Sequence, residues 1–452
     1  MGNSFTDNTT EYNSKMNDYI PDSSDIELLK EHYSKSGIKF NTDDLSSAEE
    51  WRKRVSGFYE DKCTKQICAA RSVENPLVSL IIPTYNLEKY IEQCLDSILS
   101  QTLKNIEVIC IDDSSKDSTL EILKKYAEKD GRISVYAQKN GGAASARNFA
   151  VTKALGEYIY YIDGDDYLAH DKALEILYKK ATEDKLDILL FNNDDFLDEG
   201  YECELRHWVI NTPKGILTGP QMLEQLRKLG EYRVVIWTQF TKRKYYLDNG
   251  LYFVNGIIHE DNAYTLMNYL NANRVEFIDD ILHMQRRRSN SAFTTKITFY
   301  SAYCEYLAYI DMKKTLERNV HRLTVSQYLE VCSLISSRLN TSRKKFAEFD
   351  EKEKACALYL PLNIQKDFIN EVCYPSAIYE LRTKLQRTYD EKSEINRKLQ
   401  ITYKEKSERG QEIKSLKKDN EKLKAEIINL KKNKTVIQKI KSRIYKSLKA
   451  KK

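Results

Sequence analysis

The feature that most constrains the fold is an alternation of short apolar runs with stretches of helical periodicity between Pro76 and Leu190. The runs are rich in β-branched and aromatic residues, as buried strands are. We predict strands at Val78 to Ile82, Ile106 to Ile111, Ile133 to Ala137, Tyr158 to Ile162 and Leu186 to Phe191. Strands that alternate with helices form βαβ units, so the sequence predicts an α/β fold around a mostly parallel sheet.

Helices are expected between these strands. After the first strand, Asn86 is predicted to cap a helix whose apolar residues recur at helical spacing from Tyr90 to Leu99. Further helices are expected near Ser118, Ala143 and Asp171. Residues 195–291 mix short aromatic runs with turn signals, and they would complete a domain that we place at 76–293.

The 452 residues have room for two or three domains. Residues 1–75 are polar and are predicted to form a helical appendage, with helices at Asp25 to Tyr33 and Ala48 to Tyr59. Nine cysteines lack zinc-ligand spacing, and a net charge of +5 gives no general affinity for nucleic acid. The sequence shows neither a signal-peptide pattern nor an apolar run of the roughly 18 residues that a spanning helix needs. We therefore expect a cytoplasmic protein.

Helical periodicity continues past Phe293 and predicts a helical region at 294–380. Further on, apolar residues recur every seven positions, at Leu416, Leu423, Leu430, Ile437 and Ile444, with Asn420 at the companion position. This heptad pattern predicts a coiled coil over 381–452, and a buried Asn at that position favours a parallel homodimer. The alternative is a long solvated helix without a partner.

The end of the chain is basic. No acidic residue follows Glu426, whereas ten Lys or Arg lie between Lys431 and Lys452. Apolar residues share one helical face of this tail, so it could lie peripherally on an anionic membrane surface. A soluble coiled-coil end is the alternative.

Polar and small residues follow each of the first four predicted strands. They are Pro83 to Asn86, Asp112 to Ser115, Asn140 to Gly142 with Arg147 in the next helix, and Asp163 to Asp166. Ligands of open α/β sheets bind beyond the carboxyl ends of the strands, so these residues are expected to line one edge. An aromatic ring, two acidic clusters, a glycine pair and an arginine suit a base, a ribose, a diphosphate and a divalent metal.

The acidic cluster Asp163-Gly164-Asp165-Asp166 is the sharpest single feature. Carboxylates after an apolar strand can present hard oxygen ligands to Mg²⁺ or Mn²⁺, and such ions usually share their coordination with substrate phosphates. The alternative is an ordinary loop and helix cap, because Asp is common in both roles.

Five segments resemble family 2 glycosyltransferases of the GT-A fold. They are VSLIIPTYN at 78–86, SILSQT at 97–102, VICIDDSSKDST at 108–119, NGGAASARN at 140–148 and YIYYIDGDD at 158–166. The resemblance implies a Rossmann-like mixed sheet with flanking helices. It also implies that Tyr85 contacts the nucleotide base, with Pro83 and Asn86 beside it at the substrate-binding edge.

The same resemblance assigns the other residues of this edge. Asp113 would bind the base or its ribose, and Arg147 would lie near the diphosphate. Asp165 would be the main metal ligand of the family's DxD motif, with Asp163 helping to hold the nucleotide sugar. From the residues alone, Tyr85 could equally pack in the core and Arg147 could lie on a surface helix.

His259-Glu260-Asp261 precedes another helical run. Here the family places an acidic pair whose second carboxylate is the catalytic base, which corresponds to Asp261. A carboxylate at a helix start can point into a cleft and accept the proton of an acceptor hydroxyl. The alternative is an Asp that favours the helix start through the macrodipole. His259 and Glu260 are predicted to be supports.

The stretch from Gln285 to Ser291 resembles the family's later arginine-serine segment, in which Arg286 and Arg288 match. Guanidinium groups suit bidentate phosphate contacts. The family more often has Tyr at Gln285 and Pro at Ser289, and a solvated basic strand is the alternative. The QxxRW motif of processive relatives is absent, which favours transfer of single sugars.

Motifs and resemblance together predict an inverting glycosyltransferase (EC 2.4) that depends on Mn²⁺ or Mg²⁺. It would move a single sugar from a nucleotide-sugar donor to a hydroxyl of a growing glycan in bacterial capsule, lipopolysaccharide or lipooligosaccharide synthesis. A lipid-linked acceptor would give the basic tail a role. One alternative is a nucleotidyltransferase, which would need a glycine-rich phosphate loop. The other is an inactive transferase-like scaffold acting through its coiled coil, which the intact acidic clusters disfavour.

Overall fold

The computed structural model describes residues 23–35, 64–70, 73–198, 200–202, 212–288 and 298–373, together with six helical positions between 418 and 428. The chain divides into two compact units, Met1–Lys366 and Asp367–Lys452, and the first contains the sheet. The predicted helix at 48–59 and the basic tail lie outside the described residues, as does the coiled coil apart from those six positions.

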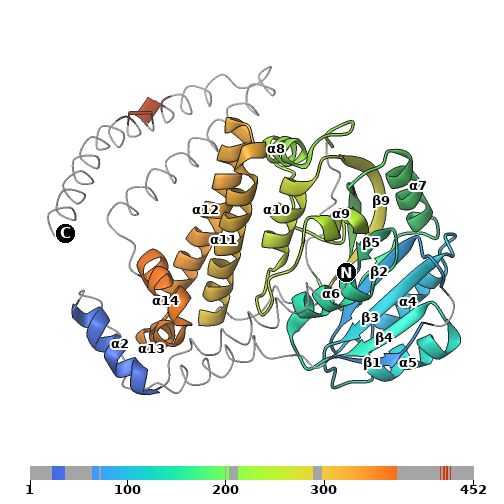
Figure 1. The fold of residues 1–452 in the computed structure, drawn as a ribbon, viewed down its shortest axis with the longest axis horizontal. Coiled ribbons are helices and arrows are strands. Elements are labelled where there is room, and N and C mark those ends of the chain that lie inside the picture. The colour runs from blue at the N-terminus through green and yellow to red at the C-terminus, as the bar shows by residue number, and fades with distance from the viewer. Residues whose placement is uncertain are drawn as a thin grey trace. The chain divides into compact units, whose positions relative to one another are not determined.

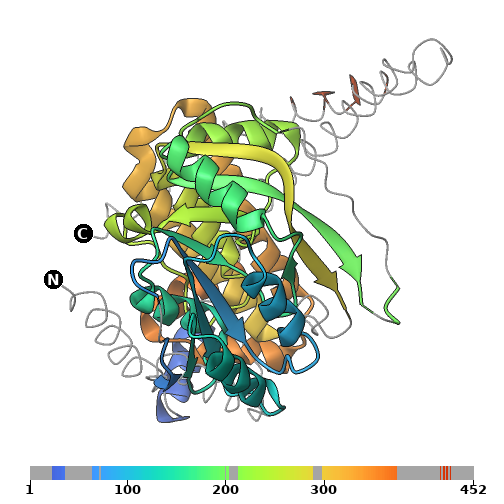
Figure 2. The same ribbon diagram turned by 90° about the vertical axis from the view of Figure 1, so that its right-hand side faces the viewer.

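The sheet is mixed and has nine strands (Figure 1). They are β1 (Lys65–Cys68), β2 (Val78–Thr84), β3 (Ile106–Asp112), β4 (Ile133–Ala137), β5 (Tyr158–Tyr161), β6 (Tyr167–Leu168), β7 (Ile188–Leu197), β8 (Gln239–Lys242) and β9 (Val275–Arg287). Their order across the sheet is β1-β4-β3-β2-β5-β8-β7-β9-β6. The strands from β4 to β5 run parallel, and so do β7 and β9, which lie side by side in Figure 2. The remaining pairs are antiparallel.

The predicted α/β fold is therefore confirmed, and each predicted strand is present. β4 has the predicted bounds, whereas β7 extends six residues beyond Phe191. Nearly every side chain of β2 and β3 is buried, because helices cover both faces of these parallel strands.

The helices that the structure describes are α2 (Ser23–Lys35), α4 (Ile91–Leu99), α5 (Thr119–Lys129), α6 (Gly142–Lys153), α7 (Ala173–Glu183), α8 (Gly219–Leu229), α9 (Arg243–Asp248), α10 (Asp261–Asn271), α11 (Phe299–Asn319), α12 (Val325–Ala347), α13 (Glu351–Ala355) and α14 (Leu362–Phe368), with short turns η2 (Val320–Arg322), η3 (Cys356–Tyr359) and η4 (Ile369–Cys373). Seven of them, α4 to α10, cover the two faces of the sheet. Apolar residues of α4, α5 and α7 form one core with the sheet, and those of α6, α8, α9 and α10 form the other.

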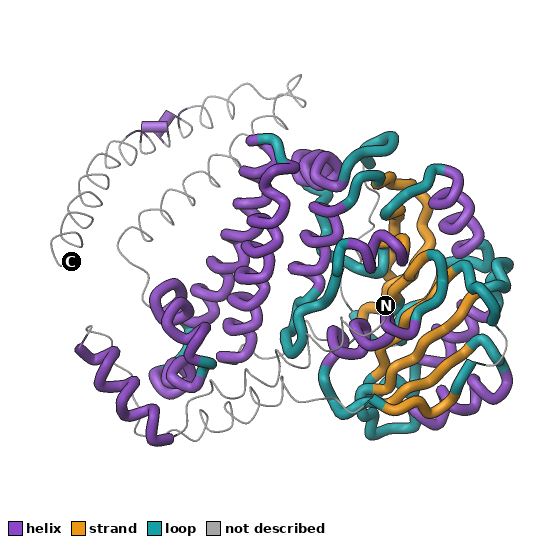
Figure 3. Tube along the Cα trace, in the orientation of Figure 1, coloured by secondary structure: helices purple, strands orange, loops and turns teal. Residues whose placement is uncertain are grey.

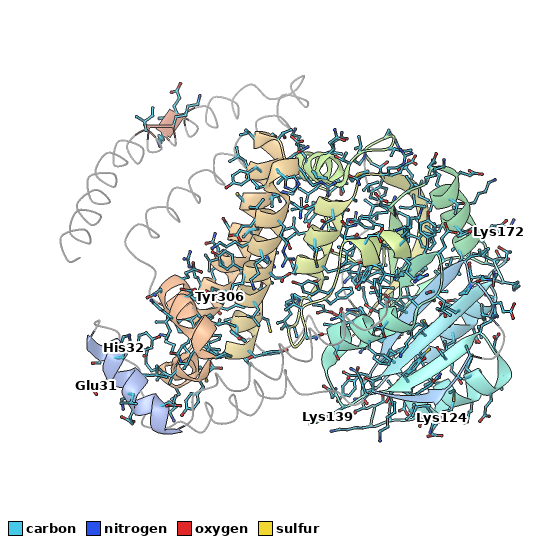
Figure 4. All side chains as sticks on the ribbon, viewed as in Figure 1. Glu31, His32, Lys124, Lys139, Lys172 and Tyr306 are labelled. Atoms are coloured by element: carbon cyan, nitrogen blue, oxygen red, sulfur yellow. The ribbon has the colours of Figure 1, made fainter. Side chains whose placement is uncertain are left out.

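The predicted helical region packs against the second of these cores. Met312 of α11 and Val331 of α12 are buried in it, and α10 lies between α11 and the sheet (Figure 3). Tyr306 on α11, labelled in Figure 4, is almost fully buried. In the described part of the chain, no helix combines the length and apolar character needed to cross a bilayer.

Two local predictions need correction. Asn86 does not cap a helix, because α4 begins at Ile91 after Tyr90, which provides no side-chain cap. Strand β1 was not predicted at all and lies within the segment expected to be a helical appendage. It pairs with β4 at the edge of the sheet, and its four mostly exposed residues carry no apolar alternation that would reveal a strand.

Candidate active site

The loops after β2, β3 and β4 are bonded to one another at the carboxyl edge of the sheet. The amide of Asp113 donates to the carbonyl of Thr84 at 2.8 Å. The side chain of Asn86 accepts from the amide of Lys116 at 2.8 Å, which explains its left-handed φ of 53° better than a capping role does. The predicted convergence of these loops is therefore observed.

Pro83, near the end of β2, and Tyr85, in the loop that follows, have different environments. The Tyr85 side chain is 45% exposed, so its ring lies at the surface and not in the core. Pro83 is half-buried within β2. An exposed aromatic ring beside the edge is available for stacking, as the resemblance implies for Tyr85.

Asp113 is committed to contacts within the protein. Its Oδ1 accepts hydrogen bonds from Gln138 Nε2 and the amide of Gly141, both at 2.7 Å, and its Oδ2 accepts from the amide of Gly142 at 2.8 Å. These bonds anchor the start of α6, where Gly142 has a φ of 80°.

The neighbouring Asp112 is buried as well. Its Oδ2 accepts from the amide of Ser115 at 3.1 Å, whereas its buried Oδ1 has no hydrogen-bond partner among the described residues. Burial raises the pKa of this carboxyl above its usual value. Asp112 and Asp113 are only 2% and 4% exposed.

The three carboxylates after β5 have separate environments. The Asp163 and Asp165 side chains remain 32% and 20% exposed, whereas that of Asp166 is 4% exposed. Asp166 bonds His283 Nε2 at 3.0 Å and the amide of Arg286 at 2.8 Å. Burial raises the pKa of Asp166 well above its usual range and lowers that of His283 to about 4. Asp166 therefore holds the loop in place, and Asp163 and Asp165 face the open side.

Gly164 makes this loop compact. A Cβ atom at Gly164 would lie 2.8 Å from Leu87 Cδ1 and 3.1 Å from Ile91 Cδ1, so the loop packs closely on the start of α4. A side chain at this position would collide with Leu87, so the close packing of the loop requires glycine.

Asp163 and Asp165 fit a divalent cation. Burial and the charge of Asp163 raise the pKa of Asp165, as expected for carboxylates that share a small volume. Among the described residues, no group of three or more His, Cys, Asp or Glu is placed to hold a metal. One or two carboxylates suffice for an ion such as Mg²⁺ that takes its other ligands from water and phosphates.

The two arginines of β9 and its end contact this loop differently. Arg286 donates to the carbonyl of Asp165 at 2.9 Å and to Asp198 Oδ1 at 2.8 Å, and its guanidinium lies 4.5 Å from the centre of the Phe196 ring. Through these contacts Arg286 supports the loop that contains Asp165. Arg288 Nε donates to Asp165 Oδ2 at 2.7 Å, which places its positive charge beside the predicted metal ligand.

Arg147 joins the two acidic motifs. Its side chain is 6% exposed, its Nη2 lies 2.8 Å from Asp163 Oδ1 and its Nη1 lies 2.5 Å from Glu260 Oε1. The three residues come from α6, the loop after β5 and the residue before α10. Glu260, which was predicted to be a support, is thus the residue through which Arg147 connects the loop before Asp261 to the loop after β5.

Asp261 is the first residue of α10 and faces a cavity of about 400 Å³. His259, two residues earlier, has a φ of 62°, which is uncommon for a residue other than glycine. Burial and the charge of Glu260 raise the pKa of Asp261 to about 7. A carboxylate with this pKa can take a proton near neutral pH, which is the property of a general base.

The cavity is bounded by β7 and β9, by the loop before β8, by the start of α10 and by α11 and α12. Arg233, Arg287 and Arg338 are among its lining residues, together with Trp237. Sequence reasoning missed these four residues, because no local motif marks them.

Comparison with known proteins identifies relatives that are named glycosyltransferases. The model of the family described as Glycosyl transferase family 2 matches residues 79–251. The chain is 36% identical over 235 residues to the uncharacterized glycosyltransferase EpsJ of Bacillus subtilis, which covers 51% of this chain and 67% of EpsJ. It is 33% identical over 227 residues to the glycosyltransferase GlyG of Streptococcus pneumoniae, which covers 49% of this chain and 74% of GlyG.

Among solved structures, one that the chain matches is the crystal structure of S. aureus TarS residues 1–349 in complex with UDP-GlcNAc. It is 23% identical, with a TM-score of 0.48 over 65% of this chain and 79% of that chain.

Proposed function

The chain belongs to glycosyltransferase family 2, and from this premise we propose that it transfers a single sugar from a nucleotide-sugar donor to a hydroxyl of a growing glycan, with inversion at the anomeric carbon. The proposed setting is the assembly of a bacterial surface polysaccharide such as capsule or lipopolysaccharide. The observation that carries the proposal is the double ion pair of Arg147, which brings the carboxylates after β5 together with the loop of Asp261.

Each side of this arrangement has a proposed task. Asp163 and Asp165 would hold Mn²⁺ or Mg²⁺, and such an ion supplies positive charge to a departing diphosphate. Tyr85, whose side chain is 45% exposed, would contact the base.

On the other side, Asp261 would accept the proton of the acceptor hydroxyl as that oxygen forms its bond to the anomeric carbon. Arg147 keeps the two carboxylate groups in one site and neutralises part of their charge. Arg288, bonded to Asp165, adds a second guanidinium on the phosphate side. We propose no role for Asp113 and Arg286 beyond anchoring the loops that carry these groups.

The inactive scaffold is a weaker explanation. A chain that acted only through helical contacts would have no reason to hold Asp261 with a pKa of about 7 in a cavity beside a paired acidic loop.

The test is hydrolysis of nucleotide sugars with and without Mn²⁺, measured for the full chain and two variants. Asp165→Ala should abolish the metal-dependent activity and weaken nucleotide binding. Asp248→Ala removes an exposed carboxylate that pairs with Lys244 on α9, and it should retain activity. If Asp165→Ala and the unaltered chain hydrolyse the donor equally fast, the proposed metal site is wrong.

A further inference from the structure

The cavity beside Asp261 has a chemical character that the family membership does not specify. The inference drawn from this character rests on the proposed function, because the hydroxyl that loses its proton to Asp261 must enter this cavity. At about 400 Å³, the cavity is within the usual size range of small-molecule sites. Its described lining includes neither Asp163 nor Asp165, so it lies on the acceptor side of the site.

Three guanidinium groups line this cavity from three parts of the fold. Arg233 comes from the loop before β8, Arg287 from β9 and Arg338 from α12. Arginine is the residue best suited to bind carboxylates and phosphates, because its planar fork donates two parallel hydrogen bonds.

Two of these arginines are held in place while keeping a donor group. Arg287 uses its Nε and Nη2 on Asp195 Oδ2, at 2.8 and 2.7 Å. Arg338 uses its Nη1 on Glu305 Oε2 at 3.2 Å and its Nε on Ser337. Within the described part of the chain, Arg287 Nη1 and Arg338 Nη2 make no hydrogen bond. Both side chains remain about a quarter exposed, at 29% and 26%.

The carboxylates that hold these arginines do not line the cavity in every case. Glu305 is a lining residue, whereas Asp195, the partner of Arg287, and Glu231, which lies 3.7 Å from Arg233, are not among the described lining residues. Three guanidinium groups therefore face the cavity beside two lining carboxylates, Glu305 and Asp261.

Trp237 is a further lining residue of this wall. Its indole is 8% exposed and stacks on His283 at 6.2 Å between ring centres. The cavity thus combines guanidinium donors and an aromatic side chain beside a candidate base.

We propose that the acceptor is an anionic glycan, whose phosphate or carboxylate group is bound by Arg287, Arg338 and Arg233 while its neighbouring hydroxyl faces Asp261. The oxyanion is not the diphosphate of the donor, because the residues on the donor side are Asp163, Asp165 and Arg288. The three cavity arginines therefore determine acceptor specificity.

The experiment measures binding of three probes to the full chain by calorimetry: glucose, glucuronate and glucose 6-phosphate. At least one anionic probe should bind about tenfold more tightly than glucose, and the better of the two identifies the carboxylate or the phosphate as the natural group. Arg338→Gln should remove most of this preference, whereas Arg338→Lys should retain part of it.

Arg227→Gln is the matched control. Arg227 lies on α8 and pairs with Glu330 of α12, the helix that carries Arg338, and neither residue is among those that line the cavity. The control should leave the preference unchanged. Equal binding of glucose and both anionic probes overturns the proposal, and so does competition between the bound anion and UDP, which would place the anion in the donor site. Hydrolysis of nucleotide sugars, measured in parallel, reports on the proposed function separately.

Discussion

Replacing Asp261 by Asn distinguishes a catalytic carboxylate from one that merely favours a helix start. If Asp261 served only the helix, its negative charge would stabilise α10 by about 0.3–1 kcal/mol, and Asn would weaken the fold. The structure predicts the opposite sign. Burial and Glu260 raise the pKa of Asp261 to about 7, so the folded chain holds the ionised carboxylate at a cost.

The size of this cost depends on pH. Below the ordinary Asp pKa of 3.8 the carboxyl is protonated in both the folded and the unfolded chain, and it costs nothing. Between pH 3.8 and about 7 only the unfolded chain loses the proton, so stability falls by about 1.4 kcal/mol for each pH unit. The full cost, about 4 kcal/mol, is present above pH 7, and about 2 kcal/mol is present at pH 5.

Asp261→Asn should therefore stabilise the chain at pH 8 by about 3 kcal/mol, after subtraction of the helix-start effect, and at pH 5, where the folded carboxyl is uncharged and has no such effect, by about 2 kcal/mol. Turnover should fall by about 100- to 10,000-fold, the usual contribution of a general base. Urea unfolding at both pH values measures the first effect and a transfer assay the second. Asp248→Asn, an exposed helix residue, is the control. A variant that is less stable than the parent at pH 8, or whose stability difference is the same at both pH values, would refute the reasoning.

Two further predictions concern the same group of charges. Because Asp261 must be ionised to act as a base, kcat/KM should fall tenfold for each pH unit below about pH 7. Glu260→Gln removes a negative charge that raises the pKa of Asp261, so it should shift this decrease in kcat/KM to lower pH. A pH–rate profile of both proteins checks the two predictions. Arg147→Met leaves Asp163 and Glu260 without their cation, so it should destabilise the fold by about 3–5 kcal/mol. Arg132→Met breaks a more exposed pair with Asp130 and should cost about 1 kcal/mol or less; chemical unfolding of the two variants compares them.

The central sheet was predictable because its strands are buried on both faces. Such strands appear in a sequence as continuous apolar runs, and β2 to β5 were recognised in this way. The edge strand β1 (KQIC) and the strand β8 (QFTK) are polar over much of their length, so neither forms the apolar run that revealed the equally short β5 (YIYY). The order in which β8, β7 and β9 join the sheet depends on packing between distant segments, which local periodicity does not encode.

The members of the candidate site were predictable from their motifs, but their contacts were not. Arg147 and Glu260 are 113 residues apart and Asp166 and His283 are 117 apart, so no local pattern connects them. No local pattern connects the cavity arginines either. Arg233, Arg287 and Arg338 come from the loop before β8, from β9 and from α12, and they line one cavity only in the folded chain.

The structure also separates residues that face a ligand from residues that position them. Asp113 and Arg286 match family motifs as well as Asp165 does, yet their polar atoms already bond the protein itself. A substitution at either position would displace a loop, so a loss of activity there would not show contact with the substrate. Asp165 differs, because its side chain remains 20% exposed and its Oδ2 accepts from Arg288, which lies outside the loop itself. Binding measurements on Asp165 therefore bear more directly on a ligand, whereas those on Asp113 report first on the integrity of α6.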